Sequence, residues 1–322
     1  MSTGPTRVSF EVLGRRLTAT GVDEGLARWL AHHWDRSHHR VPHHPMTIEV
    51  RCAPAPDSEA PYLAHLPDRH DAGADAASPR LTTHGAGSAA VLLGSRSGGA
   101  YLEIGVDGAV VVAWGVQGPA APGRWPLLLT LHEAVRASGL LPLHCAAAVR
   151  PGDDGATAFL GRSGAGKSTT LLTLAQAGWA PVCEDYAWLD PTSMRLYAWD
   201  TAVRLTPDTL ARLEPMRTHP ATASADPKRL LDYDELAERF GTPRRTEAPV
   251  ARLVHVERGT GASRWGSLAP EAAVPALWQA VGLPLTGYAR QQVARQIGRL
   301  VRSVELASLH VGHTPVPPRG PG

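Results

Sequence analysis

The chain has 322 residues, of which 43% are hydrophobic and 19% are charged, and its formal net charge is +2 at pH 7. Such a near-neutral composition lacks the single-sign charge that nucleic acids or membrane surfaces attract, so we expect neither as a partner. The length suits two domains of ordinary size.

The three cysteines, Cys52, Cys145 and Cys183, show no CxxC spacing and form no even disulfide set. The opening segment MSTGPTRVSFEV has no apolar core of a signal peptide, and no stretch approaches the roughly 18 apolar residues of a transmembrane helix. We therefore expect a cytoplasmic protein in a reducing compartment.

The first part of the chain alternates between strand-like and polar segments. Residues 7–20 alternate around Leu-Gly and predict a hairpin, after which Asp23 caps a helix. Residues 46–52 predict a strand, whereas residues 53–87 are rich in Pro, Asp, Ala and Gly and predict a loop. Three further segments, AAVLLGS, AYLEIGV and AVVVAWG, predict an antiparallel meander.

A helix is predicted over 122–138, ending at Gly139, and we expect it to join two domains. The predicted fold is α/β, with an N-terminal α+β region over 1–122 and a second domain over 123–312. The Pro- and Gly-rich tail over 313–322 is predicted to be disordered.

Within the second domain, residues 141–149 and 156–160 predict paired strands, and TTLLTLAQAG predicts a helix soon after them. The segment APVC predicts a strand that ends in Glu184 and Asp185. The other predicted elements are a hairpin over 194–205, a short helix over 207–213, a strand over 250–258, and helices over 270–281 and 286–306.

Between the strand at 156–160 and the following helix lies a phosphate-binding motif. Residues Gly161, Arg162, Ser163, Gly164, Ala165, Gly166, Lys167 and Ser168 fit G-x-x-x-x-G-K-[ST], and Thr169 follows them. Glycines let backbone N–H groups surround phosphates, Lys167 would place its charge on the β- and γ-phosphates, and Ser168 would give its hydroxyl to Mg²⁺. Only two of the 32 basic residues are lysines, so an ammonium at position 167 is informative. The alternative is a chance glycine turn before a helix.

The series LHCAAAV with His144, GRSGAGKST, AGW and CED resembles the HPr kinase family and its relatives, which include the precursor-peptide kinases encoded with lasso-peptide biosynthesis. The likeness covers roughly residues 125–306, and the family shares its fold with the phosphoenolpyruvate carboxykinases. The resemblance implies ATP phosphates on the loop, Mg²⁺ at Ser168 and one or both acids, and a catalytic base at Glu184 or Asp185.

The chain departs from the family pattern in two places. It has Glu-Asp where the family usually has Asp-Asp, which leaves open whether Glu184 or Asp185 is the base. It also lacks the downstream Arg-Pro-Gly-Arg stretch that HPr kinases carry, which argues against HPr as the substrate.

Each candidate residue has a structural alternative. Glu184 and Asp185, about 17 residues past Lys167, suit a Walker-B-like metal ligand and base, or else form a solvated strand end. We assign catalysis to both acids, Lys167 and His144, and the metal to Ser168 and Asp185. His144, on the strand before the loop strand, either orients a phosphate or the base, or is a buried histidine bonded to a carbonyl.

Other residues are weaker candidates. Lys228, beside Arg229, and Arg204 either line the site or are surface cations. The histidines over 32–44 lack the i, i+4 spacing of a helical zinc site and indicate a solvated polar loop. Cys145 and Cys183 lie in apolar strands and are expected to be small buried hydrophobic residues.

The sequence therefore predicts a Mg-ATP-dependent kinase that phosphorylates a hydroxyl, with a serine of a peptide or protein, such as a natural-product precursor peptide, as the favoured acceptor. Residues 1–122 would dock that peptide. Two alternatives remain open: an ATP-binding scaffold without turnover, and a small-molecule kinase. Assembly into a homo-oligomer also remains open.

Overall fold

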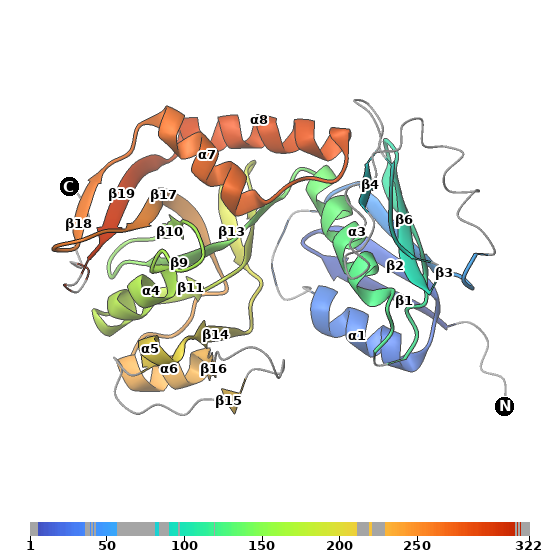
Figure 1. Ribbon diagram of the computed structural model, residues 1–322, viewed down its shortest axis with the longest axis horizontal. Helices are drawn as coiled ribbons and strands as arrows, with labels where there is room; N and C mark the ends of the chain where they lie inside the picture. Colours follow the sequence, from blue (N-terminus) through green and yellow to red (C-terminus); the bar gives the residue numbers. More distant parts are fainter. Residues whose placement is uncertain are drawn as a thin grey trace. The chain divides into compact units, whose positions relative to one another are not determined.

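The computed structural model describes residues 6–35, 39, 41, 43–56, 81–83, 90–95, 97–118, 120–210, 219–220, 229–312, 314 and 316. These residues form a mixed α/β protein with several sheets (Figure 1). The chain divides into two units. The first comprises Met1–Gly139 and Pro284–Val293, and the second comprises Leu140–Leu283 and Ala294–Gly322.

A mixed sheet forms the first unit, with strand order β1-β2-β3-β7-β6-β5-β4. The predicted hairpin is confirmed, because β1 and β2 are antiparallel and Leu13 and Gly14 take left-handed backbone angles between them. The predicted meander is also confirmed by the antiparallel neighbours β5, β6 and β7. The strands are β1 (Thr6–Val12), β2 (Arg15–Val22), β3 (Thr47–Cys52), β4 (Leu81–Thr83), β5 (Ala90–Ser95), β6 (Gly98–Ile104) and β7 (Gly108–Trp114).

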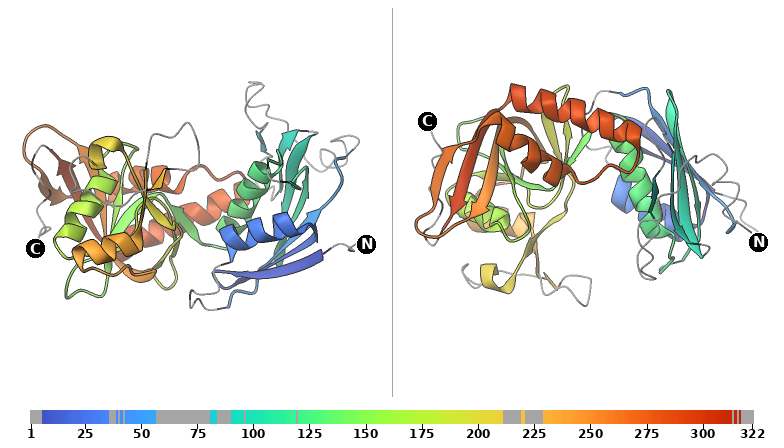
Figure 2. Two further views of the ribbon diagram at one scale, coloured as in Figure 1. Left: turned by 90° about the horizontal axis from the view of Figure 1, so that it is seen from below. Right: turned by 45° about the horizontal axis from the view of Figure 1, so that its top comes forward.

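Two helices, α1 (Glu24–Trp34) and α3 (Arg124–Ala137), lie on the same face of this sheet (Figure 2). The predicted cap is confirmed, since the Asp23 carboxylate accepts the N–H of Leu26 at 2.6 Å. Helix α3 buries an apolar face against β5, β6 and β7, and therefore belongs to the first unit. The two units divide after Gly139, whereas the sequence-based boundary lies after residue 122.

Helix α3 also holds the start of helix α8 (Gly287–Ser303). Oε1 of the fully buried Glu133 accepts the backbone N–H of Thr286 at 2.7 Å and its hydroxyl at 2.9 Å. Oε2 accepts Arg136 Nη1 at 3.1 Å. The Thr286 hydroxyl in turn accepts the N–H of Ala289 at 3.2 Å, so this residue caps α8 and ties its first turn to α3.

The second unit has a larger sheet with the order β11-β9-β10-β17-β13-β12-β8, and β19 lies beside β17 and β18. Strand β10 is antiparallel to β9 and parallel to β17. The strands are β8 (Leu141–Leu143), β9 (Cys145–Val149), β10 (Ala156–Leu160), β11 (Ala180–Cys183), β12 (Ala187–Asp190), β13 (Arg195–Ala198), β17 (Glu247–Arg258), β18 (Arg264–Ser267) and β19 (Glu305–Val311).

Helix α4 (Lys167–Gln176) packs on this sheet, and its buried Leu171 and Leu174 join a core with Ala146 and Phe159. Helix α7 (Pro270–Val281) has the predicted bounds and packs near β8 and β10. Burial of these apolar side chains fixes where β10 ends and α4 begins, which is where the phosphate-binding motif lies.

The predicted hairpin over 194–205 is wrong. Strand β13 pairs with β12 and β17, whereas β14 (Ala202–Leu205) pairs with β16 (Arg229–Asp232) in a separate sheet with β15 (His219–Pro220). Helix α6 (Tyr233–Phe240) follows β16. The turn between β13 and β14 thus carries the chain from one sheet to another.

Three other predictions need correction or stay outside the described residues. The helix predicted to reach residue 306 ends at Ser303, and β19 follows it. Helix α5 covers Pro207–Leu210, and residues 211–213 lie outside the described part of the chain. The loop predicted over 53–87 contains β4, and residues 57–80 and 84–89 are not among those described.

In the tail predicted to be disordered, Thr314 and Val316 are described, and they contradict that prediction. Val316 is buried in the core that includes Phe159, and the Thr314 hydroxyl accepts the N–H of Ser263 at 2.8 Å. The other tail residues lie outside the described part. No helix in the described ranges is both long enough and apolar enough to cross a membrane.

Candidate functional site

The phosphate-binding motif lies where the sequence predicted it, between the end of β10 and the start of α4. Gly164 and Gly166 have φ angles of 80° and 104°, in the left-handed region that favours glycine. A Cβ on Gly161 would lie 2.5 Å from the carbonyl oxygen of Val256. Backbone constraints therefore explain these three glycines, and the loop leads directly into a helix N-terminus, which attracts anions.

Lys167, the first residue of α4, is only 6% exposed. Its Nζ donates hydrogen bonds to the carbonyl oxygens of Gly161 at 2.7 Å and Arg162 at 3.3 Å. The ammonium group therefore lies against the start of the loop, close to the backbone that a phosphate would contact.

Ser168 and Glu184 meet although they come from α4 and the end of β11. The Ser168 hydroxyl donates a hydrogen bond to Oε1 of Glu184, and Oε2 accepts the backbone N–H of Arg204 at 3.1 Å. Glu184 is only 4% exposed, and burial raises the pKa of its carboxyl to about 7. Its two hydrogen bonds oppose this rise in pKa, whereas the nearby carboxylates Asp185 and Asp200 add to it.

A hydroxyl and a carboxylate are the hard oxygen donors that Mg²⁺ prefers. The sequence-based assignment gave the metal to Ser168 and Asp185. In the structure, the carboxylate that reaches Ser168 is Glu184. The described residues contain no group of three or more His, Cys, Asp or Glu side chains able to hold a metal ion.

Asp185 has a different environment from its neighbour, because its side chain is 32% exposed. Its Oδ1 lies 3.2 Å from His144 Nδ1, and its Oδ2 lies 3.8 Å from Arg204 Nη1. The two acids thus differ in environment: Glu184 is buried against α4, and Asp185 is accessible and flanked by two basic side chains.

His144 was expected on the strand before the loop strand, but it lies between β8 and β9. Its backbone N–H donates to the carbonyl of Ala280 on α7 at 2.9 Å, which fixes the break between the strands. The imidazole is 40% exposed and contacts Asp185, so it is not the buried histidine of the second interpretation.

The sequence did not single out three residues that form a cluster next to the acid pair: Asp200, Tyr233 and Arg244. Asp200 accepts the backbone N–H groups of both Glu184 and Asp185, and contacts Tyr233 and Arg244 with its other oxygen. No signal in the sequence distinguishes them. Asp200 follows an ordinary strand, and Arg244 is one of many arginines in the chain.

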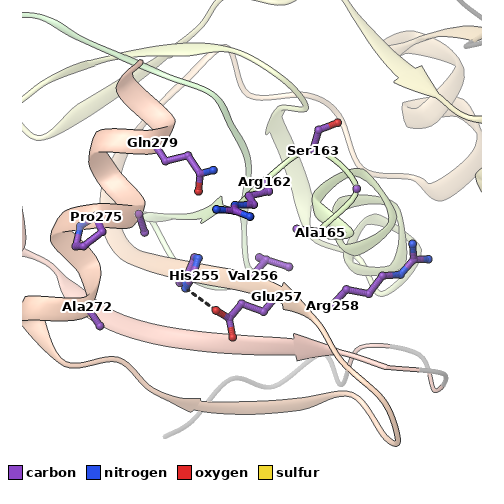
Figure 3. Close-up of a pocket in the computed structure, with 12 residues that line it drawn as sticks. Arg162, Ser163, Ala165, His255, Val256, Glu257, Arg258, Ala272, Pro275 and Gln279 are labelled. Carbon is purple, nitrogen blue, oxygen red and sulfur yellow. Dashed lines mark ion pairs between the residues drawn. The ribbon is translucent and has the colours of Figure 1, made fainter. Parts of the chain in front are cut away.

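A cavity of about 740 Å³ opens beside the loop. Loop residues, the end of β17 and one side of α7 line it (Figure 3). Figure 3 shows Gln279 of α7 and Arg162 of the loop pointing toward one another, while His255 and Glu257 extend from β17 as an ion pair at 3.6 Å. In the sheet, β17 lies on one side of β10, and β9 and β11 lie on the other. The cavity and the acid pair therefore lie at opposite sides of the loop.

The remaining candidates lie outside this site or outside the described residues. Lys228 falls outside the described part of the chain, and Arg229 is exposed on β16. Of the histidines over 32–44, His32 and His33 are on α1, and His38 lies outside the described residues. The free thiols of Cys145 and Cys183 are buried with their sulfur atoms 3.9 Å apart, as expected of small hydrophobic residues.

Neither a scan against protein-family models nor a search of curated proteins gives a match for this chain.

Proposed function

We propose that this protein is a Mg-ATP-dependent kinase that transfers the γ-phosphoryl group to a hydroxyl, with a serine of a peptide or protein as the acceptor. One observation carries the proposal. A phosphate-loop serine is hydrogen-bonded to a buried carboxylate, and an accessible carboxylate follows in the next residue.

The loop and the start of α4 would bind the triphosphate. Backbone N–H groups of Gly161 to Gly166 and the ammonium of Lys167 provide positive charge where phosphates need it. Ser168 and Glu184 would hold Mg²⁺, and this ion would neutralise the charge that develops on the transferred phosphoryl group. The proposed fold is that of the HPr kinases and phosphoenolpyruvate carboxykinases, and the loop and acid pair at the ends of β10 and β11 support it.

We assign the catalytic base to Asp185. Glu184 is buried and already accepts two hydrogen bonds, whereas Asp185 is accessible to an acceptor from outside. Its carboxylate would take the proton of the acceptor hydroxyl while that oxygen bonds to the γ-phosphorus and the bond to ADP breaks. His144 and Arg204 would hold the carboxylate in place.

The nucleoside would occupy the cavity beside the loop. Because the acid pair must lie at the γ-phosphate, the other end of the triphosphate leaves the loop on the opposite side, which is where the cavity opens. A volume of about 740 Å³ falls within the usual range of small-molecule sites.

The test is phosphorylation measured by intact mass. The full-length protein with Mg-ATP is incubated with candidate peptides encoded nearby and, separately, with small hydroxyl compounds, while ADP is measured. A mass gain of about 80 Da per serine on a peptide, that of one added HPO₃ group, supports the proposal if it is lost in Lys167→Ala and Asp185→Asn but kept in Asp190→Asn. Tight ATP binding without ADP formation would instead indicate a scaffold, and transfer to a small compound alone would indicate a small-molecule kinase.

A further inference from the structure

Asp200 lies in the turn between β13 and β14, and its side chain is largely buried. One of its oxygens, Oδ2, accepts the backbone N–H of Glu184 at 2.6 Å and that of Asp185 at 2.9 Å. These two N–H groups are consecutive and follow directly after β11. A single carboxylate oxygen therefore fixes the short segment that carries both acids.

The other oxygen of Asp200 is fixed as well. Oδ1 accepts the Tyr233 hydroxyl at 3.1 Å and Arg244 Nη2 at 2.7 Å. Arg244 also donates to the carbonyl oxygens of Val182 on β11 and of Asp200 itself, at 3.0 and 2.7 Å. Its guanidinium lies 3.7 Å from the centre of the Tyr233 ring. Asp200 therefore contacts the backbone directly after β11, and Arg244 contacts the backbone of β11 itself.

Asp200 is suited to this task because its contacts satisfy a buried charge. Burial raises the pKa of its carboxyl, and Arg244 and the two backbone N–H groups counter this rise. A buried carboxylate that lost these partners would be strongly unfavourable, so the cluster has one well-defined arrangement.

We propose that Asp200 is a positioning residue that orients Glu184 and Asp185 for catalysis, and that Arg244 and Tyr233 hold Asp200 for this purpose. The inference rests on the proposed function, because orientation matters only if Glu184 holds Mg²⁺ and Asp185 takes the acceptor's proton. Among the contacts of the described residues, Asp200 touches neither the phosphate loop nor the cavity, so it would affect Mg-ATP only through the two acids.

Asp200→Asn tests the proposal. An asparagine has one acceptor oxygen, so its NH₂ group must face either the two backbone N–H groups or the donors of Arg244 and Tyr233. We expect kcat to fall about 10- to 100-fold, as for other residues that orient a metal ligand. The affinity for metal-free ATP should change less than about threefold, because the loop is untouched, whereas the KM for Mg-ATP should rise, because Glu184 would hold Mg²⁺ less well.

The matched control is Asp190→Asn. The Asp190 carboxylate also holds a turn, by accepting the Thr192 N–H and the Ser193 hydroxyl, each at 2.8 Å, but it holds no residue of the site. This variant should leave kcat and KM unchanged. An unchanged kcat in folded Asp200→Asn, or a loss confined to KM, would overturn the positioning role.

Calorimetry provides a readout that does not depend on transfer. ATP affinity is measured with and without Mg²⁺, and Asp200→Asn should lose most of the Mg²⁺-dependent gain while metal-free affinity stays the same. If the wild-type protein transfers no phosphate, the proposed function fails, yet this comparison still decides the role of Asp200. If the wild type and Asp200→Asn show the same Mg²⁺-dependent gain in ATP affinity, the positioning role of Asp200 is refuted.

Tyr233→Phe keeps the inference testable if Asp200→Asn does not fold. It removes one hydrogen bond to Oδ1 and keeps the ring against Arg244. A smaller fall in kcat than in Asp200→Asn, with unchanged affinity for metal-free ATP, supports the proposal. Wild-type kcat together with a wild-type Mg²⁺-dependent gain in affinity would overturn it.

Discussion

Replacing Glu184 by glutamine removes a buried titrating group while keeping its shape. The glutamine oxygen can accept the N–H of Arg204, and its NH₂ group can donate to the Ser168 hydroxyl, so both contacts of the native side chain persist. The variant therefore isolates the effect of the charge on stability.

The contribution of Glu184 to the free energy of unfolding changes with pH in a defined direction. Burial raises the pKa of Glu184 from its ordinary value of 4.5 to about 7, so the folded protein keeps this proton in a pH range where the unfolded chain has lost it. The resulting stabilisation is fully present below pH 4.5 and is lost as the pH rises through about 7. Each pH unit in this window is worth about 1.4 kcal/mol, which gives about 3 kcal/mol in total.

Urea unfolding followed by circular dichroism at several pH values between 4.5 and 8 measures this difference. The free energy of unfolding of the wild type, relative to Glu184→Gln, should fall by about 3 kcal/mol across the range. Glu238→Gln, which changes an exposed glutamate of α6, should run parallel to the wild type. A pH-independent difference between wild type and Glu184→Gln would refute the argument that Glu184 is buried as a titrating acid.

Three further predictions concern nucleotide binding and transfer. Lys167→Ala should lower kcat/KM by at least about 100-fold and weaken Mg-ATP binding in calorimetry, because it removes the ammonium held against the loop; a folded variant with normal turnover would contradict the site. Asp185→Asn should lower kcat more than about tenfold in steady-state assays, with little change in the KM for Mg-ATP; an effect on affinity alone would count against a base. Ala272→Trp, which places a large ring in the cavity, should raise the KM for ATP about tenfold or more at similar kcat; an unchanged KM would exclude the nucleoside from that cavity.

The loop and its flanks could be predicted because all their information is local. The motif, the apolar strand before it and the helix after it lie in one continuous segment, and glycine requirements can be read from the sequence directly. The acid pair was also found, because it ends the next apolar strand, β11. The contact between Asp185 and His144 was foreseen only as one of two interpretations.

The features that the sequence did not reveal depend on contacts between segments far apart in the chain. The segments of β13 and β14 alternate as a hairpin would, but each finds a different partner strand, and that choice is set by tertiary packing. For the same reason Asp200 and Arg244 look ordinary in the sequence, because they are 44 positions apart and only the fold brings them together. Strand β19 follows α8 with a single residue between them, so the sequence contains no turn signal that would predict where the helix ends.

The way α3 holds α8 means that the first unit is discontinuous in the chain, with its last piece, Pro284–Val293, arriving after almost all of the second. A fragment that stops at Gly139 would leave the buried Glu133 without the two donors of Thr286, and a fragment that starts near Trp125 would keep α3 but discard the sheet it covers. A single break cannot therefore yield two intact modules. A gene rearrangement that exchanged the first unit for another would need three crossovers, one after Gly139 and one on either side of Pro284–Val293.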